Sequence, residues 1–226
     1  MGGIRVADLT PFTLLDYPNT PSCIIWIAGC NLRCAYCYNK ELVFGRNGLD
    51  FDEVLRFLKS RKGLLEGVVI SGGEPTLHKE IFHILKAVKE LGFLVKLDTN
   101  GTRFKVVEEA VRSSLVAYIA LDFKAPREKF EAVAKKELFL PFSKTLRFLI
   151  KSGFDFEVRT TYHSSLLNKE DIQSMAEYLE GLGYGGNYYI QNFLSGCETI
   201  GEVPNRSEKA DITEIKREKL TLLCRN

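Results

Sequence analysis

Residues 29–39 of this chain read GCNLRCAYCYN and place Cys30, Cys34 and Cys37 on one short stretch. Thiolates at this spacing converge on one small inorganic group, because soft sulfur ligands select zinc, copper(I) or iron–sulfur clusters. An electron-transfer [4Fe–4S] centre is normally closed by four Cys. A set of three ligands therefore leaves one iron open to bind and activate another molecule.

Two other interpretations of this stretch are a structural zinc site of three Cys plus one His, and a chance spacing. Structural zinc usually takes its ligands as two spaced pairs. No second pair follows the cysteines, and His78 and His83 stand far along the chain. An iron–sulfur cluster with one open iron is therefore the favoured interpretation.

The composition is that of an ordinary soluble globular protein, with 226 residues, 45% apolar and 27% charged residues. A net charge of +2 gives no electrostatic reason to expect nucleic acid or an anionic membrane as a partner. No apolar run approaches the roughly 18 residues of a membrane span. The N-terminal MGGIRVADLTPF lacks the apolar stretch of a signal peptide. These features predict a cytoplasmic protein, in which the six Cys are metal ligands or buried thiols rather than disulfides.

A second motif, SGGEP at Ser71–Pro75, follows a predicted strand. The pair of motifs, CxxxCxxC and SGGEP, resembles the radical S-adenosylmethionine (SAM) superfamily. Further stretches resemble the glycyl-radical enzyme activases, and most of all the activating proteins of anaerobic ribonucleotide reductase. These stretches are LDYP at 15–18, LDTNG at 97–101, LDFK at 121–124 and RTT at 159–161.

Apolar runs alternate with helical patterns along the chain, which predicts a parallel sheet with right-handed crossovers. The predicted strands are 22–28, 67–71, 93–98, 118–124, 156–161 and 188–193, and the predicted helices start near 51, 81, 104, 143 and 168. Six such units make an α/β fold, an incomplete (β/α)6 parallel barrel open on one side. The resemblance to the radical SAM superfamily implies the same shape. We expect a single domain over 1–226, with an irregular lead-in at 1–21, the partial barrel at 22–195 and a tail at 196–226 that contains a helix near 209–220.

Charged residues share one face near the ends of three predicted strands. They are Lys96 and Asp98, then Asp122 and Lys124, then Glu157 and Arg159. Active sites form at the carboxyl ends of barrel strands, so we expect this face to point inward. Two aspartates about 4 Å apart would repel by roughly 4 kcal/mol at an effective dielectric near 20. Either Lys96 and Lys124 neutralise Asp98 and Asp122 or, as activases suggest, a monovalent cation is held by both aspartates and the Thr99 backbone.

The resemblance implies further roles. Cys30, Cys34 and Cys37 would hold three irons of a [4Fe–4S] cluster, and the fourth iron would chelate SAM. One electron would then cleave SAM to a 5′-deoxyadenosyl radical. The cofactor-binding residues would be Gly72, Gly73 and Glu74 at the SAM amino group, Tyr36 near the adenine, Arg159 at the carboxylate, and Asn39, Asp98, Thr99, Asp122 and Gln191. Lys124 would reach the ribose or the substrate and act as a catalytic residue.

The chain departs from the activase pattern at two positions. Tyr38 stands where activases often have His directly after the third Cys, and Gln191 stands where the pyruvate formate-lyase activase has a His in its sixth strand. Gln cannot titrate near neutrality, so this particular activase is disfavoured. No Cys-rich insert lies between Cys37 and Gly72, which disfavours activases with extra clusters.

The leading hypothesis is an activase that takes a hydrogen atom from a backbone glycine of anaerobic ribonucleotide reductase, with a one-electron donor such as flavodoxin. Alternatives are an activase of another glycyl-radical enzyme and a radical SAM enzyme with a small substrate, as in 7-carboxy-7-deazaguanine synthase. A metal-binding or electron-transfer module without catalysis leaves SGGEP and the inward aspartates unexplained. Cys23 is expected in the core, and Cys197 and Cys224 as structural or free thiols.

Overall fold

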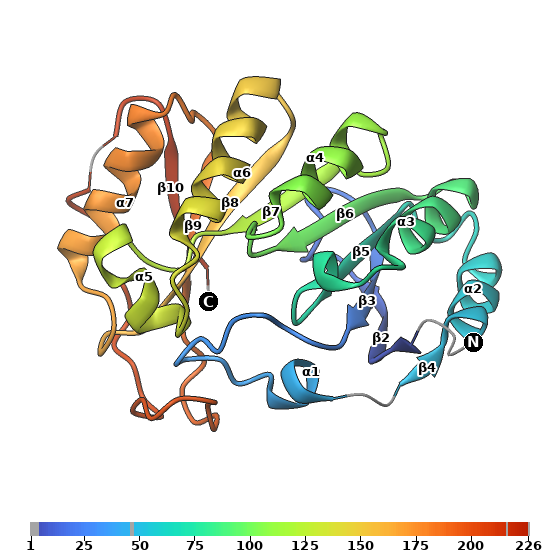
Figure 1. Cartoon of the computed structure of the whole chain (residues 1–226), viewed down its shortest axis with the longest axis horizontal. Helices are drawn as coiled ribbons and strands as arrows, with labels where there is room; N and C mark the ends of the chain where they lie inside the picture. Colours follow the sequence, from blue (N-terminus) through green and yellow to red (C-terminus); the bar gives the residue numbers. More distant parts are fainter. Residues whose placement is uncertain (1–4, 46–47, 216, 226) are drawn as a thin grey trace. The chain divides into compact units, whose positions relative to one another are not determined.

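The computed structural model describes residues 5–45, 48–215 and 217–225 (Figure 1). Residues 1–4 of the expected lead-in, and 216 and 226 of the expected tail, lie outside the described residues. The chain forms two compact units. The first unit comprises Met1–Asn31, Lys40–Thr99 and Lys105–Ile119, and the second comprises Leu32–Asn39, Asn100–Phe104 and Ala120–Asn226.

The first unit is built on parallel strands with one antiparallel edge. Its strands are β1 (Arg5–Val6), β2 (Asp8–Thr13), β3 (Ser22–Ile27), β4 (Leu49–Asp50), β5 (Gly67–Gly72) and β6 (Leu94–Thr99). β3, β5 and β6 are parallel neighbours, β2 runs antiparallel to β3, and β1 pairs with β4. β3 and β5 are almost entirely buried, as expected for parallel strands covered on both faces.

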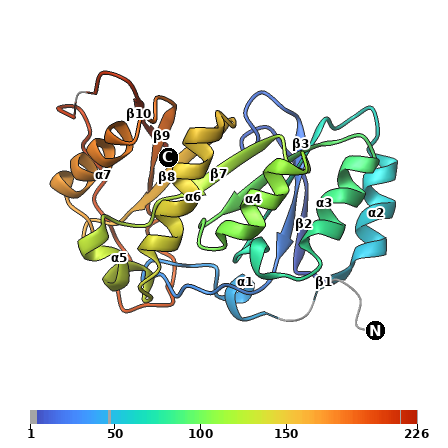
Figure 2. The same ribbon diagram turned by 45° about the horizontal axis from the view of Figure 1, so that its top comes forward.

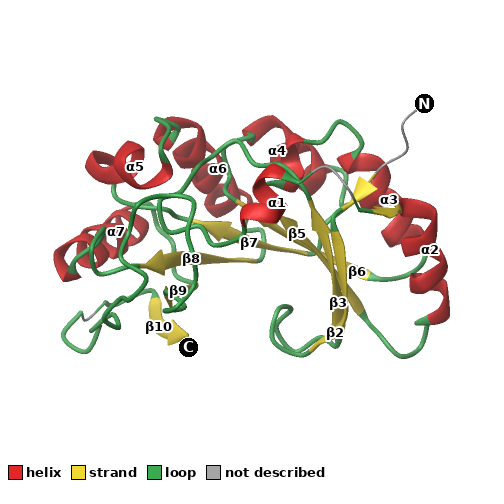
Figure 3. Cartoon of the chain, turned by 90° about the horizontal axis from the view of Figure 1, so that it is seen from below, coloured by secondary structure: helices red, strands yellow, loops and turns green. Residues whose placement is uncertain are grey.

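The helices α2 (Phe51–Ser60), α3 (Ile81–Glu90) and α4 (Phe104–Arg112, of which Phe104 belongs to the second unit) cover one face of these parallel strands (Figure 3). The unit also contains α1 (Lys40–Phe44) and the short 3₁₀ helix η1 (Pro75–Leu77). α2 begins after Asp50, whose side chain accepts a hydrogen bond from the Asp52 N–H at 3.0 Å. This cap satisfies one of the N–H groups that a helix start leaves without a partner. The buried residues of these two helices are Phe51, Val54 and Leu58 on α2 and Ile81, Ile84, Leu85 and Val88 on α3.

The second unit continues the parallel pattern. Its strands are β7 (Tyr118–Asp122), which begins in the first unit, β8 (Phe156–Tyr162), β9 (Asn187–Asn192) and β10 (Thr221–Arg225). Its helices are α5 (Arg127–Ala134), α6 (Phe139–Ser152) and α7 (Lys169–Gly181). β8, β9 and β10 are parallel, and α6 and α7 lie against β8 and β9 (Figure 2). A capping box between Asn168 and Asp171 starts α7, at the helix start predicted near 168.

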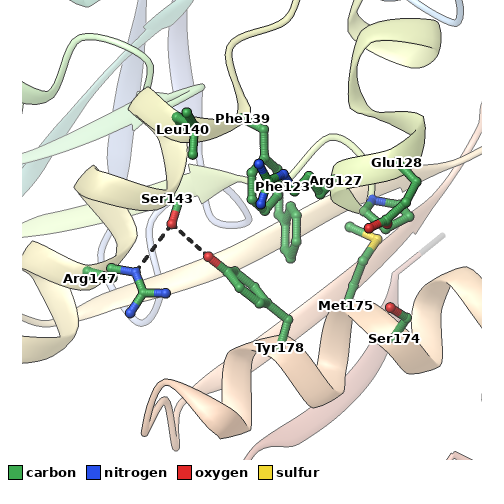
Figure 4. Close-up of a pocket in the computed structure, with 11 residues that line it drawn as sticks. Phe123, Arg127, Glu128, Phe139, Leu140, Ser143, Arg147, Ser174, Met175 and Tyr178 are labelled. Atoms are coloured by element: carbon green, nitrogen blue, oxygen red, sulfur yellow. Dashed lines mark hydrogen bonds between the residues drawn. The ribbon is translucent and has the colours of Figure 1, made fainter.

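The core of the second unit is rich in aromatic rings. Phe123 stacks on Phe142 with ring centroids 4.7 Å apart and also contacts Phe139 and Tyr178. Beside these rings lies a cavity of about 350 Å³ (Figure 4). At its wall the Ser143 Oγ lies 2.6 Å from the Tyr178 hydroxyl, so these partly buried polar groups satisfy each other.

The strand order is β10-β9-β8-β7-β6-β5-β3-β2. All six predicted strands are present in this order, and the order is linear with β10 and β2 at its ends. The α/β class and the incomplete parallel barrel are therefore confirmed. The sheet nevertheless has more strands than predicted, because β2 and β10 extend it at its two ends.

The expected irregular lead-in was wrong for residues 5–6 and 8–13, which form β1 and β2. Asp8, Leu9 and Thr10 pair with Trp26, Ile25 and Ile24 of β3. The Trp26 indole N–H donates to the Thr10 hydroxyl at 2.8 Å. Because Pro11 interrupts the strand pattern and the exposed residues do not alternate clearly, the pairing with β3 decides the structure here rather than the local sequence.

The expected helix near 209–220 was also wrong, since no helix is present among the described residues of that range. Residues of this range contact the side chains of α7 instead. Arg217 pairs with Glu177 at 2.9 Å, and the Lys219 N–H donates to the Glu180 carboxylate at 2.8 Å. The Asp211 carboxylate accepts a hydrogen bond from the Thr213 N–H at 3.0 Å and caps a turn, and the segment then enters β10.

Two smaller differences concern helices. α1 and α5 were not predicted, because both are short and α5 has only a weak apolar stripe. His78 follows η1 as its C-terminal cap, whereas His83 lies on α3 against the Phe51 ring.

The placement of β10 can be tested by a mutation at Arg225. Its Arg225 guanidinium lies 3.3 Å from the carboxylate of Glu157, whose side chain is 1% exposed, and stacks over the Tyr189 ring. We expect Arg225→Met to lower the free energy of unfolding by about 2 kcal/mol, because it leaves a buried carboxylate without its cation. Urea denaturation measures this change. The exposed Arg206, changed to Met, is the control and should shift stability by less than about 0.5 kcal/mol. Equal stability of Arg225→Met and the wild type would contradict the placement of β10.

Candidate active site

The cysteine stretch lies between β3 and α1, and its start belongs to the first unit. Gly29 has a φ of 92°, a conformation that side chains disfavour. Its N–H donates to the Leu42 carbonyl at 2.7 Å. The His78 Nε2 lies 2.5 Å from the Ala28 carbonyl oxygen. The backbone that leads to Cys30 is therefore held from two sides.

The remainder of the stretch, Leu32–Asn39, belongs to the second unit. We call this segment the cluster loop. The Arg33 N–H donates to the Ala134 carbonyl at 3.1 Å, and the Ala35 N–H donates to the Val133 carbonyl at 2.9 Å. Because the last carbonyls of a helix have no partner within it, the end of α5 offers acceptors to the cluster loop.

Cys30, Cys34 and Cys37 form no disulfide bond among the described residues. Cys34 is buried, and the other two are half-buried. Cys30 belongs to the first unit, and Cys34 and Cys37 belong to the second. Within the described ranges, no three His, Cys, Asp or Glu side chains are already arranged around a metal position. The ligand set therefore remains a prediction.

The SGGEP turn follows β5 and is bonded to the backbone just before Cys30. The Gly73 N–H donates to the Ile27 carbonyl at 2.9 Å, and the Glu74 N–H donates to the Gly29 carbonyl at 2.8 Å. A Cβ on Gly72 would lie 2.0 Å from the Ile27 oxygen, and a Cβ on Gly73 would lie 2.2 Å from the Gly29 oxygen. Only glycine fits at these two positions.

The carboxylate of Glu74 braces this turn. Its side chain is fully buried, and its Oε1 accepts hydrogen bonds from the Thr76 N–H at 3.1 Å and the Thr99 hydroxyl at 2.8 Å. The Thr76 hydroxyl donates to the same oxygen. A buried carboxylate needs such partners. Glu74 thus links the turn to the end of β6. The motif alone did not indicate that Thr76 and Thr99 would bond this carboxylate.

Asp98 at the end of β6 is neutralised within the first unit. The Lys96 Nζ lies 2.6 Å from its Oδ1, and the Ser71 hydroxyl donates to its Oδ2 at 3.1 Å. The side chains of Lys96 and Asp98 are 1% and 11% exposed. The predicted lysine partner of Asp98 is therefore present, and Ser71 adds a hydrogen bond that sequence reasoning missed.

Asp122 is neutralised within the second unit by two cations. The Lys124 Nζ lies 3.1 Å from its Oδ2, and the Arg159 Nη2 lies 3.0 Å from its Oδ1. Burial lowers the pKa of Lys124, but the charges of Asp122, Tyr36 and Cys34 outweigh burial and place the pKa well above its usual range. The predicted lysine partner of Asp122 is again present and carries its proton on Nζ.

Tyr36 lies next to this cation pair. Its side chain is 5% exposed, and its hydroxyl has no hydrogen-bond partner within the part of the chain that the structure describes. Burial raises the pKa of Tyr36; the nearby Lys124 lowers it, whereas Cys34, Asp122 and Cys37 raise it further. A buried hydroxyl without a partner costs free energy, so a ligand that bonds this oxygen would relieve the cost.

The other two predicted cofactor-binding residues, Asn39 and Gln191, are half-buried. Asn39 ends the cluster loop. Gln191 lies on β9, paired in register with Thr161 of β8 and Arg225 of β10. Gln191 therefore stands close to the end of a parallel strand, where barrel enzymes bind their ligands.

The residues present fit an iron–sulfur cluster and a polar ligand beside it. The donor set consists of soft sulfur atoms. The glycine turn has no room for a Cβ, so its backbone comes close to the start of the cysteine stretch. The Tyr36 hydroxyl supplies an unused buried hydrogen-bonding group.

Comparison with known proteins agrees with this fit. Residues 24–181 match the model of the radical SAM superfamily. The chain is 32% identical over 195 residues to a Methanocaldococcus jannaschii protein that is provisionally named a glycyl-radical enzyme activating enzyme, covering 83% of this chain and 79% of that protein. It is also 32% identical over 139 residues to the 7-carboxy-7-deazaguanine synthase of Aquifex aeolicus, covering 61% of this chain and 60% of the synthase.

A solved structure supports the fold. The crystal structure of Streptococcus suis SuiB bound to its precursor peptide SuiA matches with a TM-score of 0.67 and 19% identity, covering 90% of this chain and 48% of SuiB. At this identity the match shows the fold alone.

No helix among the described residues is long and apolar enough to cross a bilayer. The family match spans more than half of the chain, and the chain therefore belongs to the radical SAM superfamily, whose members use a [4Fe–4S] cluster and SAM.

Proposed function

We propose that this chain is an activase of a glycyl-radical enzyme, and that its substrate is anaerobic ribonucleotide reductase. The observation that carries the proposal is the pair of backbone hydrogen bonds that join the SGGEP turn to the residues just before Cys30. Support for an activase comes from the M. jannaschii relative, which matches over 83% of this chain. Support for the reductase comes from LDYP and LDTNG, which resemble its activating proteins.

The cluster and SAM, when bound, supply the 5′-deoxyadenosyl radical that removes a hydrogen atom from the substrate. Cys30, Cys34 and Cys37 would hold three of the irons. The backbone of Gly72–Glu74 would bind the SAM amino group, because the two glycines leave no side chain in the way. The buried Tyr36 side chain would help to exclude water from the site.

Arg159 would bind the SAM carboxylate, since a guanidinium suits a carboxylate geometrically. In the structure it bonds Asp122, which also accepts from Lys124. Asp122 would therefore keep a cation partner when Arg159 turns toward SAM. Lys124, which is protonated, would then donate to a ribose oxygen or to the substrate, and Asn39 and Gln191 would contact the nucleoside.

We further propose that lysines, rather than a monovalent cation, neutralise the two aspartates. Lys96 is 2.6 Å from Asp98 and Lys124 is 3.1 Å from Asp122. A cation bound by Asp98, Asp122 and the Thr99 backbone would have to compete with both ammonium groups at close range.

A small-molecule substrate is the second candidate. It is favoured by the identity of 32% to the A. aeolicus synthase. That match covers 61% of this chain, whereas the activase relative covers 83%. The longer match and the LDYP and LDTNG stretches make the activase the better-supported function.

The proposal includes a reducing compartment, the cytoplasm, and a one-electron donor such as flavodoxin. None of the six cysteines forms a disulfide bond among the described residues. Free thiols persist where glutathione and thioredoxin keep cysteines reduced.

The first prediction concerns SAM cleavage. After anaerobic reconstitution with iron and sulfide, the protein with SAM and a one-electron reductant should form 5′-deoxyadenosine, measured by chromatography. Cys34→Ala should lower its formation to background, because two thiolates hold a cluster poorly. The exposed Cys224, changed to Ala, should retain cleavage and is the matched control. Loss of the cluster in Cys224→Ala would contradict the ligand assignment.

The second prediction separates the two substrate classes. Adding anaerobic ribonucleotide reductase to the reconstituted protein should produce a glycyl-radical doublet in the EPR spectrum. Production of 5′-deoxyadenosine with a small-molecule substrate, and no doublet with the reductase, would favour the synthase-like alternative.

The third prediction concerns the glycine turn. Gly73→Ala places a Cβ against the Gly29 carbonyl, so the turn must move. We expect the free energy of unfolding to fall by about 1–3 kcal/mol, a typical overpacking cost, and SAM affinity, measured by calorimetry, to fall at least roughly tenfold. Gly181→Ala, at a glycine with open space around its Cβ position, is the control. Wild-type SAM affinity in Gly73→Ala would argue against the proposed backbone contact.

The fourth prediction concerns the aspartates. Replacing sodium and potassium in the buffer with tetramethylammonium, which is too large for a small cation site, should leave SAM affinity unchanged. A dependence of SAM affinity on potassium or sodium concentration would show that a monovalent cation binds after all.

A further inference from the structure

The chain after β9 runs back to the cluster loop. We call residues 196–201 the strap. The Ile200 N–H donates to the Cys37 carbonyl at 2.8 Å, and the Gly201 N–H donates to the Ala35 carbonyl at 3.0 Å. The strap and the cluster loop both belong to the second unit. Segments far apart in the sequence therefore share backbone hydrogen bonds at the cysteines.

The cluster loop is held from its other side by α5. The Ala35 N–H donates to the Val133 carbonyl at 2.9 Å, while the Ala35 carbonyl accepts from Gly201. Ala35 thus bonds two neighbours, as a residue in a central strand does. A buried segment needs partners for its N–H and C=O groups. The end of α5 accepts from N–H groups of the cluster loop, and the strap donates to its carbonyl groups.

Close packing makes glycine necessary at the contact. A Cβ on Gly201 would lie 2.6 Å from the Ala35 Cα and 2.8 Å from the Ala35 oxygen. These are backbone atoms, which cannot rotate away as a side chain can. Any larger residue at 201 must push the strap away from the cluster loop.

The strap is itself braced. The Thr199 hydroxyl donates to the Gly201 carbonyl at 2.7 Å, and the Gly196 N–H donates to the Asn205 carbonyl at 2.6 Å. Phe193, which precedes the strap, contacts the Tyr38 ring edge-on at a centroid distance of 6.5 Å. Contacts before, within and after the strap therefore hold it in place.

We propose that the strap is a positioning element for the iron–sulfur cluster. It fixes the backbone of Ala35–Cys37 so that the Cys34 and Cys37 thiols can bind the same group. This inference rests on the proposed function of the cysteines. The strap lies in the tail, outside the cysteine motif, so this inference gives a part of the tail a role at the cysteines.

The test uses Gly201→Val, which adds bulk against Ala35, and Thr199→Val, which removes only the hydroxyl that braces Gly201. Each variant is reconstituted anaerobically, and the iron and sulfide that remain at a fixed chelator concentration are measured. We expect Gly201→Val to retain roughly tenfold less iron, since a factor of ten corresponds to about 1.4 kcal/mol, within the usual overpacking cost. Thr199→Val should lose iron in the same direction but less.

Two control variants show whether a glycine substitution elsewhere, or the thiol of the strap, affects iron retention. Gly181→Ala, in the same unit and with open space at its Cβ position, should retain wild-type iron. Cys197→Ser keeps the strap backbone and removes its thiol, and it should also retain wild-type iron. Loss of iron in Cys197→Ser would overturn the inference, because the strap would then act through sulfur rather than through its backbone.

A second readout uses the metal-free protein. The amide protons of Ile200 and Ala35 should exchange with solvent slowly in the wild type and faster in Gly201→Val, while circular dichroism shows that the variant remains folded. If the wild type binds no iron, the proposed function fails, yet the exchange measurement still tests the strap. Wild-type iron content in Gly201→Val, or unprotected Ile200 and Ala35 amides in the wild type, would overturn the inference.

Discussion

Two backbone hydrogen bonds, from the Gly73 N–H to the Ile27 carbonyl and from the Glu74 N–H to the Gly29 carbonyl, hold the end of β5 against the start of the cysteine stretch. They form only because the Cβ positions of Gly72 and Gly73 are empty. Adjacent parallel strands bring their carboxyl ends to the same edge, so β3 and β5 deliver both motifs to one place. The chemistry proposed for the chain depends on this contact.

The turn is in turn fixed by charge and hydrogen bonding. Glu74 is fully buried and reaches Thr99 at the end of β6. One residue earlier, Asp98 bonds Ser71, which begins the SGGEP motif. The motif residues therefore serve two purposes: their glycines leave space for a ligand, and their polar side chains attach the turn to the next strand. A substitution at Ser71 or Glu74 would reach the site through the backbone that they hold.

Much of the fold could be predicted because β3 and β5 are buried apolar runs, and burial on both faces is encoded locally. The edge strands β2 and β10 could not be predicted, because their composition is mixed and they form through pairing with a neighbouring strand. Trp26 bonds Thr10 of β2, and Glu157 pairs with Arg225 of β10.

For the site, the pairing of each aspartate with a lysine two residues away followed from strand alternation. The hydrogen bonds from α5 and residues 196–201 to the cluster loop could not be predicted, because they join backbone atoms of segments that are distant in sequence.

The ion pairs also bear on how SAM would be bound. Asp122 contacts both Lys124 and Arg159, and a carboxylate has enough lone pairs for both. A SAM carboxylate that draws Arg159 away would leave Asp122 with Lys124. Burial lowers the pKa of Lys124, but the nearby Asp122 carboxylate helps to hold it above its usual range. The site would then exchange one carboxylate partner of Arg159 for another without leaving a buried charge unpaired, which is the expensive outcome. The arrangement of two cations around Asp122 is therefore suited to a ligand that arrives with a negative charge.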